Sequence, residues 1–268
     1  MAFVDYEKKE NIVTITINRP DRLNALGTEV VAELDDAFKK FCSDPEARVA
    51  ILTATGRAFS VGADVKDMAK PAAQAEASSD KEYQAHNPAQ EALDKIEKVM
   101  RGVTKPVITA VNGFALGSAF EAVVLQSDIR IAAESATFGM PEIGLAIPAH
   151  PDYFIAQGIS LSAAMEIILL GDPITAQRAY DIGLVNKVVP DEELMTAAMK
   201  VAERIARLSP WATSLVRQFG MKVVEVSEEY WKVKQKRNEV RKMMQTSEDY
   251  HEAVKAFAEK RKPVFKGK

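Results

Sequence analysis

Two hydrophobic patterns alternate along the first part of the chain. Between Ile12 and Ile17 apolar and polar residues take turns, which predicts a half-buried β-strand. After Thr28, a residue suited to cap a helix, apolar residues recur every three or four positions until Asp44-Pro45, which predicts an amphipathic helix. A short apolar run at Val49–Thr53 then predicts a buried strand. This part of the chain therefore combines strands with a helix.

The same patterns continue beyond a segment, Pro71–Asn87, that is polar and Ala-rich and predicts a mobile surface stretch. Strands are predicted at Pro106–Val111, Ile129–Ala132, Ala136–Met140 and Leu184–Val189. Helices are predicted around Ile96 and at Ser118–Leu125, Ser162–Leu170 and Thr175–Ile182. From Asp191 onward nearly every segment has helical spacing. The fold class is thus predicted to be α/β, with a core at residues 1–195 and an α-helical region at residues 196–268.

Composition limits the classes of protein to which the chain can belong. Its 268 residues are 47% hydrophobic and 27% charged, as in ordinary soluble domains. The single cysteine, Cys42, excludes a disulfide framework and any metal site built from several cysteines. The net charge of −3 argues against a dedicated nucleic-acid binder. We therefore expect a soluble protein without a resident metal ion.

No targeting or membrane segment is expected. Met1–Lys9 alternates apolar and charged residues and lacks the apolar centre of a signal peptide. Pro106–Leu125 is nearly free of charge, but Glu121 and two glycines suit a buried strand, turn and helix better than a lipid span. With one cysteine and no targeting segment, we expect the protein in the cytoplasm and away from membranes.

The run Gly117-Ser118-Ala119-Phe120-Glu121 lies where a predicted strand passes into a helix. Small residues let other atoms approach the backbone, and the first N–H groups of a helix favour negative charge on a bound group. Glu121 follows in an apolar neighbourhood, where burial would raise its pKa and make it a usable general acid or base. The alternative is that Ser118 and Glu121 form a capping box, which the pattern alone favours.

Two further segments carry candidate chemistry. Gly56–Asp64 follows a buried strand, and its backbone N–H groups suit the second arm of an oxyanion hole. A tight strand-to-helix connection capped by Asp64 is the commoner reading of such a segment. Glu142 lies between Pro141 and apolar residues, where a glutamate is usually only a first-turn helix residue. Glu142 has a chemical role if it faces Glu121. Two carboxyl groups at one apolar site have pKa values that are pushed apart, so that one can act as an acid and the other as a base.

Weaker candidates lie nearer the C-terminus. His150 belongs to a stiff Pro-containing loop, where a histidine is more often a packing residue than a catalyst. The basic tail, Lys260-Arg261-Lys262 with Lys266 and Lys268, is either a solvated end or a contact for phosphates.

Taken in order, these segments resemble the crotonase family, the enoyl-CoA hydratase/isomerase superfamily, over nearly the whole chain. The matching stretches are Asn18–Leu26, Gly56–Asp67, Lys105–Gly117, Ser127–Ala132, Phe138–Ile143, Ala164–Glu166, Ala179–Val185 and Glu259–Pro263. The resemblance implies a spiral of ββα units followed by a C-terminal α-helical trimerisation region. It also implies an acyl-CoA thioester substrate, a homotrimer or dimer of trimers, and no cofactor besides the coenzyme A of the substrate.

The resemblance also implies roles for single residues. The thioester oxygen would accept hydrogen bonds from the backbone N–H groups of Ala63 and Ser118. Glu121 would position and activate water, and Glu142 would exchange a proton with the substrate α-carbon. Contacts with CoA or substrate would come from Arg22, Leu23, Ala63, Asp64, Val65, Lys66, Ser118, His150 and Lys260.

Three departures from the family pattern concern the acyl group. Ser118 stands where glycine is usual, Phe120 is bulkier than the usual residue, and Ala149–Phe154 replaces a Gly-rich run with Thr-Gln-Arg. They favour an acyl group other than a simple straight chain. An enoyl-CoA hydratase is the leading expectation. The alternatives are an isomerase or a His150-assisted thioester hydrolase of the same fold, or a non-catalytic relative that binds acyl-CoA or RNA.

Overall fold

Strands of two sheets form the centre of the molecule. The computed structural model describes residues 2–64, 88–147, 149, 151–225 and 247–266. The six-stranded sheet has the order β1 (Val4–Lys9), β2 (Ile12–Ile17), β3 (Val49–Ala54), β5 (Val107–Val111), β7 (Ile129–Ala133), β10 (Lys187–Val189). The four-stranded sheet has the order β4 (Ala58–Ser60), β6 (Phe114–Leu116), β8 (Thr137–Gly139), β9 (Ile174–Thr175). Of the strand pairs in the described residues, β1–β2 and β8–β9 are antiparallel and the others are parallel.

The two sheets arise from a repeated step in the chain. A long strand of the first sheet is followed after a short connection by a three-residue strand of the second, as β3 by β4, β5 by β6 and β7 by β8. Buried apolar runs explain the long strands, since every residue of β3 and β5 is buried. The predicted mixed α/β class is confirmed, and so is the strand, turn and helix reading of Pro106–Leu125.

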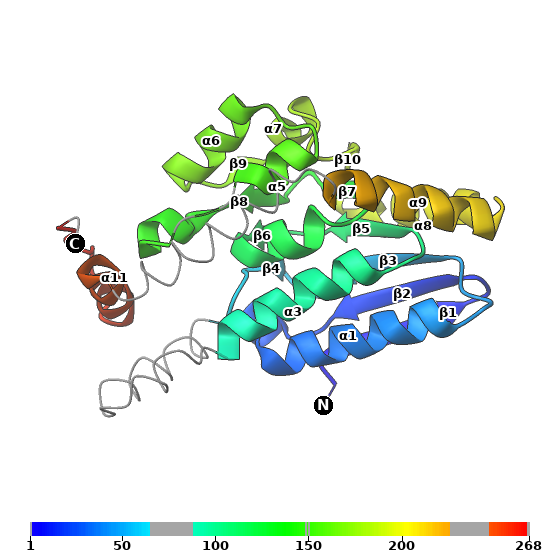
Figure 1. Ribbon diagram of the computed structural model, residues 1–268, viewed down its shortest axis with the longest axis horizontal. Coiled ribbons are helices and arrows are strands. Elements are labelled where there is room, and N and C mark those ends of the chain that lie inside the picture. Colours follow the sequence, from blue (N-terminus) through cyan, green and yellow to red (C-terminus); the bar gives the residue numbers. More distant parts are fainter. Residues whose placement is uncertain (1, 65–87, 148, 150, 226–246, 267–268) are drawn as a thin grey trace.

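Helices cover the six-stranded sheet on both faces. The amphipathic helices α1 (Thr28–Ser43) and α3 (Pro88–Gly102) pack side by side, as Figure 1 shows, while α8 (Leu194–Ala206) packs against β2, β3, β5 and β7. The remaining elements are the 3-10 helices η1 (Pro20–Arg22), η4 (Pro141–Leu145) and η5 (Asp191–Glu193), and the helices α5 (Pro151–Ala156), α6 (Leu161–Leu170), α7 (Ala176–Asp181), α9 (Pro210–Glu225) and α11 (Glu248–Ala258).

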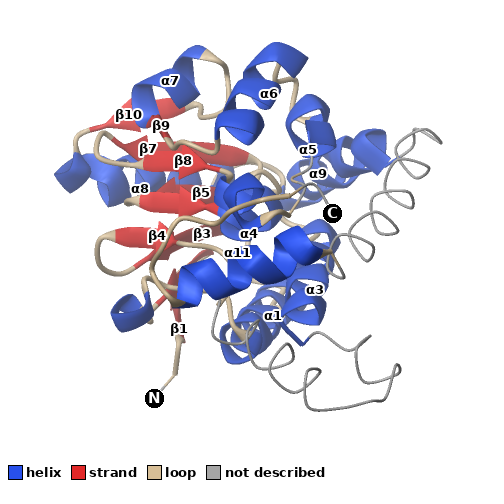
Figure 2. Cartoon of the chain, turned by 90° about the vertical axis from the view of Figure 1, so that its left-hand side faces the viewer, coloured by secondary structure: helices blue, strands red, loops and turns tan. Residues whose placement is uncertain are grey.

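The last helices lie far apart. Figure 1 places α9 and α11 at opposite ends of the molecule, and Figure 2, which looks along the line between those ends, shows α11 in front; α11 packs against η4. The predicted division at residue 195 stays a prediction, as does the mobile segment Pro71–Asn87, which lies outside the described residues. Within the described part of the chain, no helix is long and apolar enough to cross a membrane.

Gly113 closes the turn between β5 and β6 and lies against the backbone of the β3–β4 turn. A Cβ at Gly113 would contact the Arg57 carbonyl oxygen and lie 2.7 Å from its carbon and 3.2 Å from the Ala58 Cα. We expect Gly113→Ala to lower the free energy of unfolding by about 1–3 kcal/mol, because backbone cannot move aside as a side chain can. Gly102→Ala is the control, since nothing lies within 4 Å of its Cβ position. Equal urea midpoints for the two variants would contradict this account.

Candidate active site

Three adjacent parallel strands deliver the candidate residues to one edge of the small sheet. In the pairing of β4, β6 and β8, Ser60 lies beside Ala115, and Leu116 lies beside Gly139. The segments that follow these strands carry Ala63, Ser118 and Glu142, respectively. Since parallel strands end at the same edge, these segments meet there, and ligands commonly bind at such an edge.

The segment after β6 turns sharply at Gly117 and enters an irregular helix. Gly117 has a φ of +57°, in the left-handed region that favours glycine. The helix begins as α4 (Gly117–Ala119) and continues as the π-helical η3 (Phe120–Val124), with a hydrogen bond of 3.0 Å from the Leu125 N–H to the Phe120 carbonyl oxygen. The helix predicted over Ser118–Leu125 is therefore confirmed, and the structure adds that most of it is π-helical. π-Helical turns occur frequently at functional sites.

The capping-box interpretation of Ser118 and Glu121 is wrong. The N-cap is Leu116, and no side chain caps the helix. The Ser118 hydroxyl oxygen is buried and has no hydrogen-bond partner among the described residues. A capping box needs the serine hydroxyl to accept an N–H of the first turn. The Ser118 N–H lies at the start of the helix instead, where backbone donors suit a negatively charged group.

The segment after β4 lies directly against this helix start. Gly62 has a φ of +87°, and a Cβ there would lie 2.9 Å from the Leu116 carbonyl oxygen and 3.3 Å from the Ser118 nitrogen. Ala63 is the next residue, so the structure brings the two predicted amide arms side by side. The loop interpretation of Gly56–Asp64 missed β4, which is only three residues long.

Glu142 reaches the same point from the third strand. It lies in η4, directly after Pro141, and is half-buried. Its Oε1 lies 2.5 Å from the position that a Cβ on Gly117 would occupy. The absence of a side chain at Gly117 thus makes room for the Glu142 carboxyl group at the start of α4.

Glu121 lies about one helical turn beyond Gly117 and is half-buried. Glu121 therefore follows four residues after Gly117, the residue that the Glu142 carboxyl group approaches. Its neighbour Phe120 is fully buried, with its ring centroid 5.5 Å from that of Phe138 and 5.4 Å from that of Phe154. The helix that carries Glu121 is thus packed through Phe120 into an aromatic cluster.

The predicted contact residues are placed as follows. Arg22 ends η1, and the carbonyl oxygen of the next residue, Leu23, accepts a hydrogen bond of 3.2 Å from the Val61 N–H. The carboxylate of Asp64 forms an ion pair of 3.0 Å with Arg19. Val65, Lys66 and His150 lie outside the described residues.

Sequence reasoning missed Asn24. Its amide donates to the carbonyl oxygens of Thr55 (2.8 Å) and Ala58 (2.7 Å), and its side chain is fully buried. The signal was present as a polar residue between Leu23 and the apolar Ala25-Leu26. A buried polar side chain needs partners, and those partners are distant in the sequence.

Lys260 lies at the end of α11, the helix that packs against η4. It has a φ of +54°, its N–H bonds to the Phe257 carbonyl oxygen (3.2 Å), and the Arg261 N–H bonds to that of Ala256 (3.0 Å). This is a Schellman motif with lysine at the position usually taken by glycine. The exposed Lys260 thus holds a strained conformation just beyond the end of α11.

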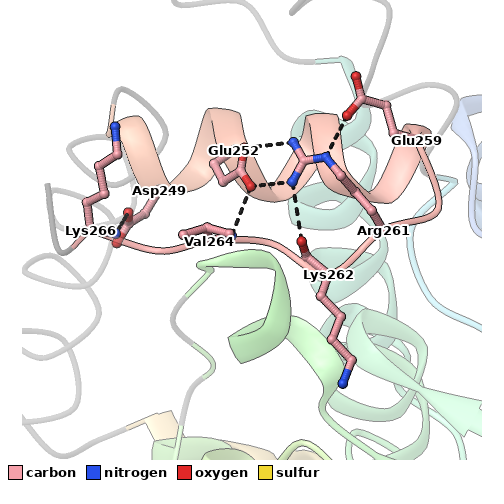
Figure 3. A network of polar contacts seen from close by, with 7 residues as sticks. All are labelled: Asp249, Glu252, Glu259, Arg261, Lys262, Val264 and Lys266. Carbon is pink, nitrogen blue, oxygen red and sulfur yellow. Dashed lines mark hydrogen bonds and ion pairs between the residues drawn. The ribbon is translucent and has the colours of Figure 1, made fainter.

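The rest of the basic tail is largely neutralised by acidic residues of α11 (Figure 3). Arg261 pairs with Glu252 (2.5 Å) and Glu259 (2.6 Å). The backbone N–H groups of Val264 and Lys266 donate to Glu252 (2.9 Å) and Asp249 (2.6 Å), so the tail runs back along the helix. Of the described basic tail residues, Lys260 and Lys262 have ammonium groups in no ion pair among the described residues.

The stability of the contact between the basic tail and α11 also depends on pH. The Arg261 guanidinium, followed by the Val264 N–H, lowers the pKa of Glu252 to about 2 from the ordinary 4.5. A lowered pKa stabilises the docked tail above pH 4.5, and this contribution is lost as the pH falls through 2. We expect a carboxyl titration of Glu252 by NMR to show a midpoint near 2. A midpoint near 4.5 would mean that the tail is detached in solution, and Glu252→Gln, which lacks the carboxyl group, identifies the Glu252 resonance by its absence.

Together these groups can polarise a carbonyl oxygen and move a proton beside it. The Ser118 N–H at a helix start and the Ala63 N–H from the adjacent segment suit negative charge on an oxygen, and two carboxyl groups can act as acid and base. Among the described residues, no group of three His, Cys, Asp or Glu side chains is gathered as a metal would require.

Comparison with known proteins gives consistent matches over the full length. Residues 7–268 match the family described as enoyl-CoA hydratase/isomerase. A probable mitochondrial enoyl-CoA hydratase of Dictyostelium discoideum is 38% identical over 266 residues, covering 98% of this chain and 90% of that protein. The structure of carnitinyl-CoA hydratase from Mycobacterium avium aligns with a TM-score of 0.83 at 32% identity, covering 100% of both chains. A methylmalonyl-CoA decarboxylase in complex with 2-nitronate-propionyl-CoA aligns with a TM-score of 0.84 at 29% identity, covering 99% of both chains.

Proposed function

Because the chain belongs to the enoyl-CoA hydratase/isomerase family, we propose that it is a hydro-lyase that adds water reversibly to a 2-enoyl-CoA. Family membership confirms the resemblance seen in the sequence motifs and the expectation of an enzyme. The observation that carries the specific reaction is the Glu142 carboxyl group at Gly117, next to the Ala63 and Ser118 segments.

The proposed oxyanion hole consists of the Ala63 and Ser118 N–H groups. Addition of water to the double bond moves negative charge onto the thioester oxygen. Donors that are already fixed in place stabilise this charge without reorganising, and they therefore lower the activation barrier. Loss of one such donor typically raises the activation free energy by about 2.7–4 kcal/mol. The close approach of Gly62 to the Ser118 nitrogen supports this pairing.

The two glutamates complete the reaction. Glu121 accepts a proton from the water as the water oxygen bonds to the β-carbon and the C=C π bond opens, and a protonated Glu142 gives its proton to the α-carbon; proton exchange with solvent then restores both carboxyl groups. In the reverse direction the same groups remove the proton and release water, so no redox step is needed. We therefore propose that coenzyme A, carried by the substrate, is the only cofactor, and that a chelator leaves turnover unchanged.

CoA contacts are proposed for Arg22, Leu23, Val65, Lys66, His150 and Lys260. Lys260 offers a sharp test because its backbone strain and its charge have opposite effects. We expect Lys260→Gly to stabilise the end of α11 by about 1 kcal/mol, since glycine suits a positive φ. The same change should raise KM for crotonyl-CoA but not for crotonyl-pantetheine, which lacks the nucleotide phosphates. An unchanged KM for crotonyl-CoA would remove Lys260 from the proposed contacts, with Lys262→Ala as the control.

The test of the proposed function is hydration of crotonyl-CoA, followed as loss of the conjugated thioester absorbance. A mass gain of one water across short, branched, aromatic and cyclic enoyl-CoAs would identify the acyl group. Double-bond migration without added water would indicate an isomerase instead, and release of free thiol would indicate a hydrolase. Binding of acyl-CoA or of RNA without turnover would indicate a non-catalytic relative.

We further propose a homotrimer or a dimer of trimers in the cytoplasm. On α9, Trp211, Val216 and Phe219 have exposed fractions of 75%, 70% and 58% in the single chain. Apolar residues this exposed on one helix suit a subunit interface. Light scattering of the purified protein tests the assembly, and a monomer would contradict it.

A further inference from the structure

The direction of the Ala63 N–H is set by the peptide unit that joins Gly62 to Ala63. The Gly62 carbonyl oxygen accepts a hydrogen bond of 2.7 Å from the Leu26 N–H, and Leu26 and Ala63 form a β-bridge. The described chain contains no cis peptide bond, so the C=O and N–H of this unit point in opposite directions. Holding the oxygen toward Leu26 therefore turns the Ala63 N–H away from Leu26.

The segment that carries Leu26 is itself anchored by Asn24. The Asn24 side chain accepts from the Arg19 N–H (2.8 Å) and donates to the Thr55 and Ala58 carbonyl oxygens. Its own N–H bonds to the Arg19 carbonyl oxygen at 3.0 Å. Arg19 and Asn24 thus close one turn, which is fastened to the connection between β3 and β4.

On its other side, Ala63 is followed by a second anchor. The Asp64 carboxylate lies 3.0 Å from Nη1 of Arg19, and the two side chains are only 7% and 15% exposed. The Arg19 guanidinium also lies 5.1 Å from the centre of the Phe3 ring. A charge-assisted hydrogen bond shielded from water in this way restricts the backbone more than an exposed pair does. Ala63 is therefore held from both sides by the same turn.

We propose that Arg19, acting through Asp64, is a positioning residue for the Ala63 N–H. The inference rests on the proposed function, because that N–H is one donor of the proposed oxyanion hole. It assigns Asp64 an orienting role in place of the expected CoA contact. An interaction that improves only in the transition state affects kcat more than KM. A donor misplaced by about 1 Å can cost about 100-fold in rate.

The experiment compares wild-type protein with Arg19→Met, Arg19→Lys and Asp64→Asn. Methionine keeps the packing on Phe3 and removes the charge, while lysine keeps the charge. We expect Arg19→Met and Asp64→Asn to lower kcat for crotonyl-CoA by about 10- to 100-fold with KM within about 3-fold of wild type, and Arg19→Lys to recover part of the loss. Arg178→Met is the matched control, because it breaks the exposed ion pair of 2.8 Å with Glu166.

A spectroscopic readout separates positioning from a purely structural role. Hydrogen bonds to a conjugated thioester carbonyl polarise it and shift its absorbance to longer wavelength. Bound cinnamoyl-CoA should show this red shift with wild-type protein and with Arg178→Met, a smaller shift with Arg19→Lys, and least with Arg19→Met. A full red shift and full kcat in Arg19→Met would overturn the proposal, as would a raised KM at unchanged kcat in Asp64→Asn.

The outcomes also distinguish this inference from the proposed function. A red shift in wild-type protein without hydration of any enoyl-CoA would remove the hydratase proposal and leave the positioning role to be decided by the variants. No red shift in wild-type protein would overturn the oxyanion hole and the positioning role together. If Arg19→Met fails to fold, Arg19→Lys and Asp64→Asn decide the question.

Discussion

Glu142→Gln should lower turnover of crotonyl-CoA by about 10²- to 10⁴-fold, the usual contribution of a positioned acid or base. Glutamine keeps the size of the side chain but cannot exchange a proton with the α-carbon. The half-buried carboxyl group lies at the start of α4, so its loss should affect chemistry more than folding. The measurement is kcat for hydration together with deuterium incorporation at the α-carbon in heavy water.

Glu121→Gln should cause a loss of similar size by leaving the water without its base. Glu166→Gln is the control for both, since Glu166 lies on the surface of α6 in an exposed ion pair with Arg178. If both glutamate variants keep near-normal turnover, the proposed acid–base pair is wrong. If only Glu121→Gln keeps near-normal turnover, a group other than Glu121 must activate the water.

Gly117→Ala should reduce turnover by about 100-fold and stability by about 1–2 kcal/mol. The loss of stability follows from the φ of +57°, which an L-residue with a Cβ adopts only under strain. The loss of activity follows from the 2.5 Å between the new Cβ and Oε1 of Glu142. A flexible carboxyl end can move aside, so the protein should fold, but the displaced group no longer meets the substrate. The measurements are kcat and the urea unfolding midpoint.

Gly144→Ala is the matched control for Gly117→Ala. Gly144 lies two residues from Glu142, has no positive φ, and has nothing within 4 Å of its Cβ position. Its activity and stability should stay near those of wild type. Full activity in Gly117→Ala would show that the position of the Glu142 carboxyl group is not critical.

The long strands could be predicted from the sequence because they are buried apolar runs. The strand predicted at Val49–Thr53 is observed as Val49–Ala54, and the one at Ile129–Ala132 as Ile129–Ala133. The small sheet could not be predicted in full, because β4 and β6 are only three residues long and lie within glycine-containing turns. The start of α5 was interpreted as part of a stiff loop, because Pro148 and Pro151 lie on either side of His150.

The candidate site could likewise be predicted only in part from the sequence. Family motifs identified Ala63, Ser118, Glu121 and Glu142, but the sequence could not show whether these residues meet. Their approach depends on strand register, since the pairing of Leu116 with Gly139 is what brings Glu142 to Gly117. The π-helical winding around Glu121 was hidden too, because one altered hydrogen bond leaves the apolar spacing almost unchanged.

The delivery of each group by a separate strand has a consequence for how such a protein diversifies. The amide segments follow β4 and β6, whereas the atypical stretch Ala149–Phe154 follows β8 and η4. Under the proposed function, substitutions in that stretch would change the surroundings of the acyl group while the segments proposed to bind the thioester oxygen remain as they are. Recognition of the variable half of a metabolite and activation of its constant half can therefore evolve independently, on one scaffold.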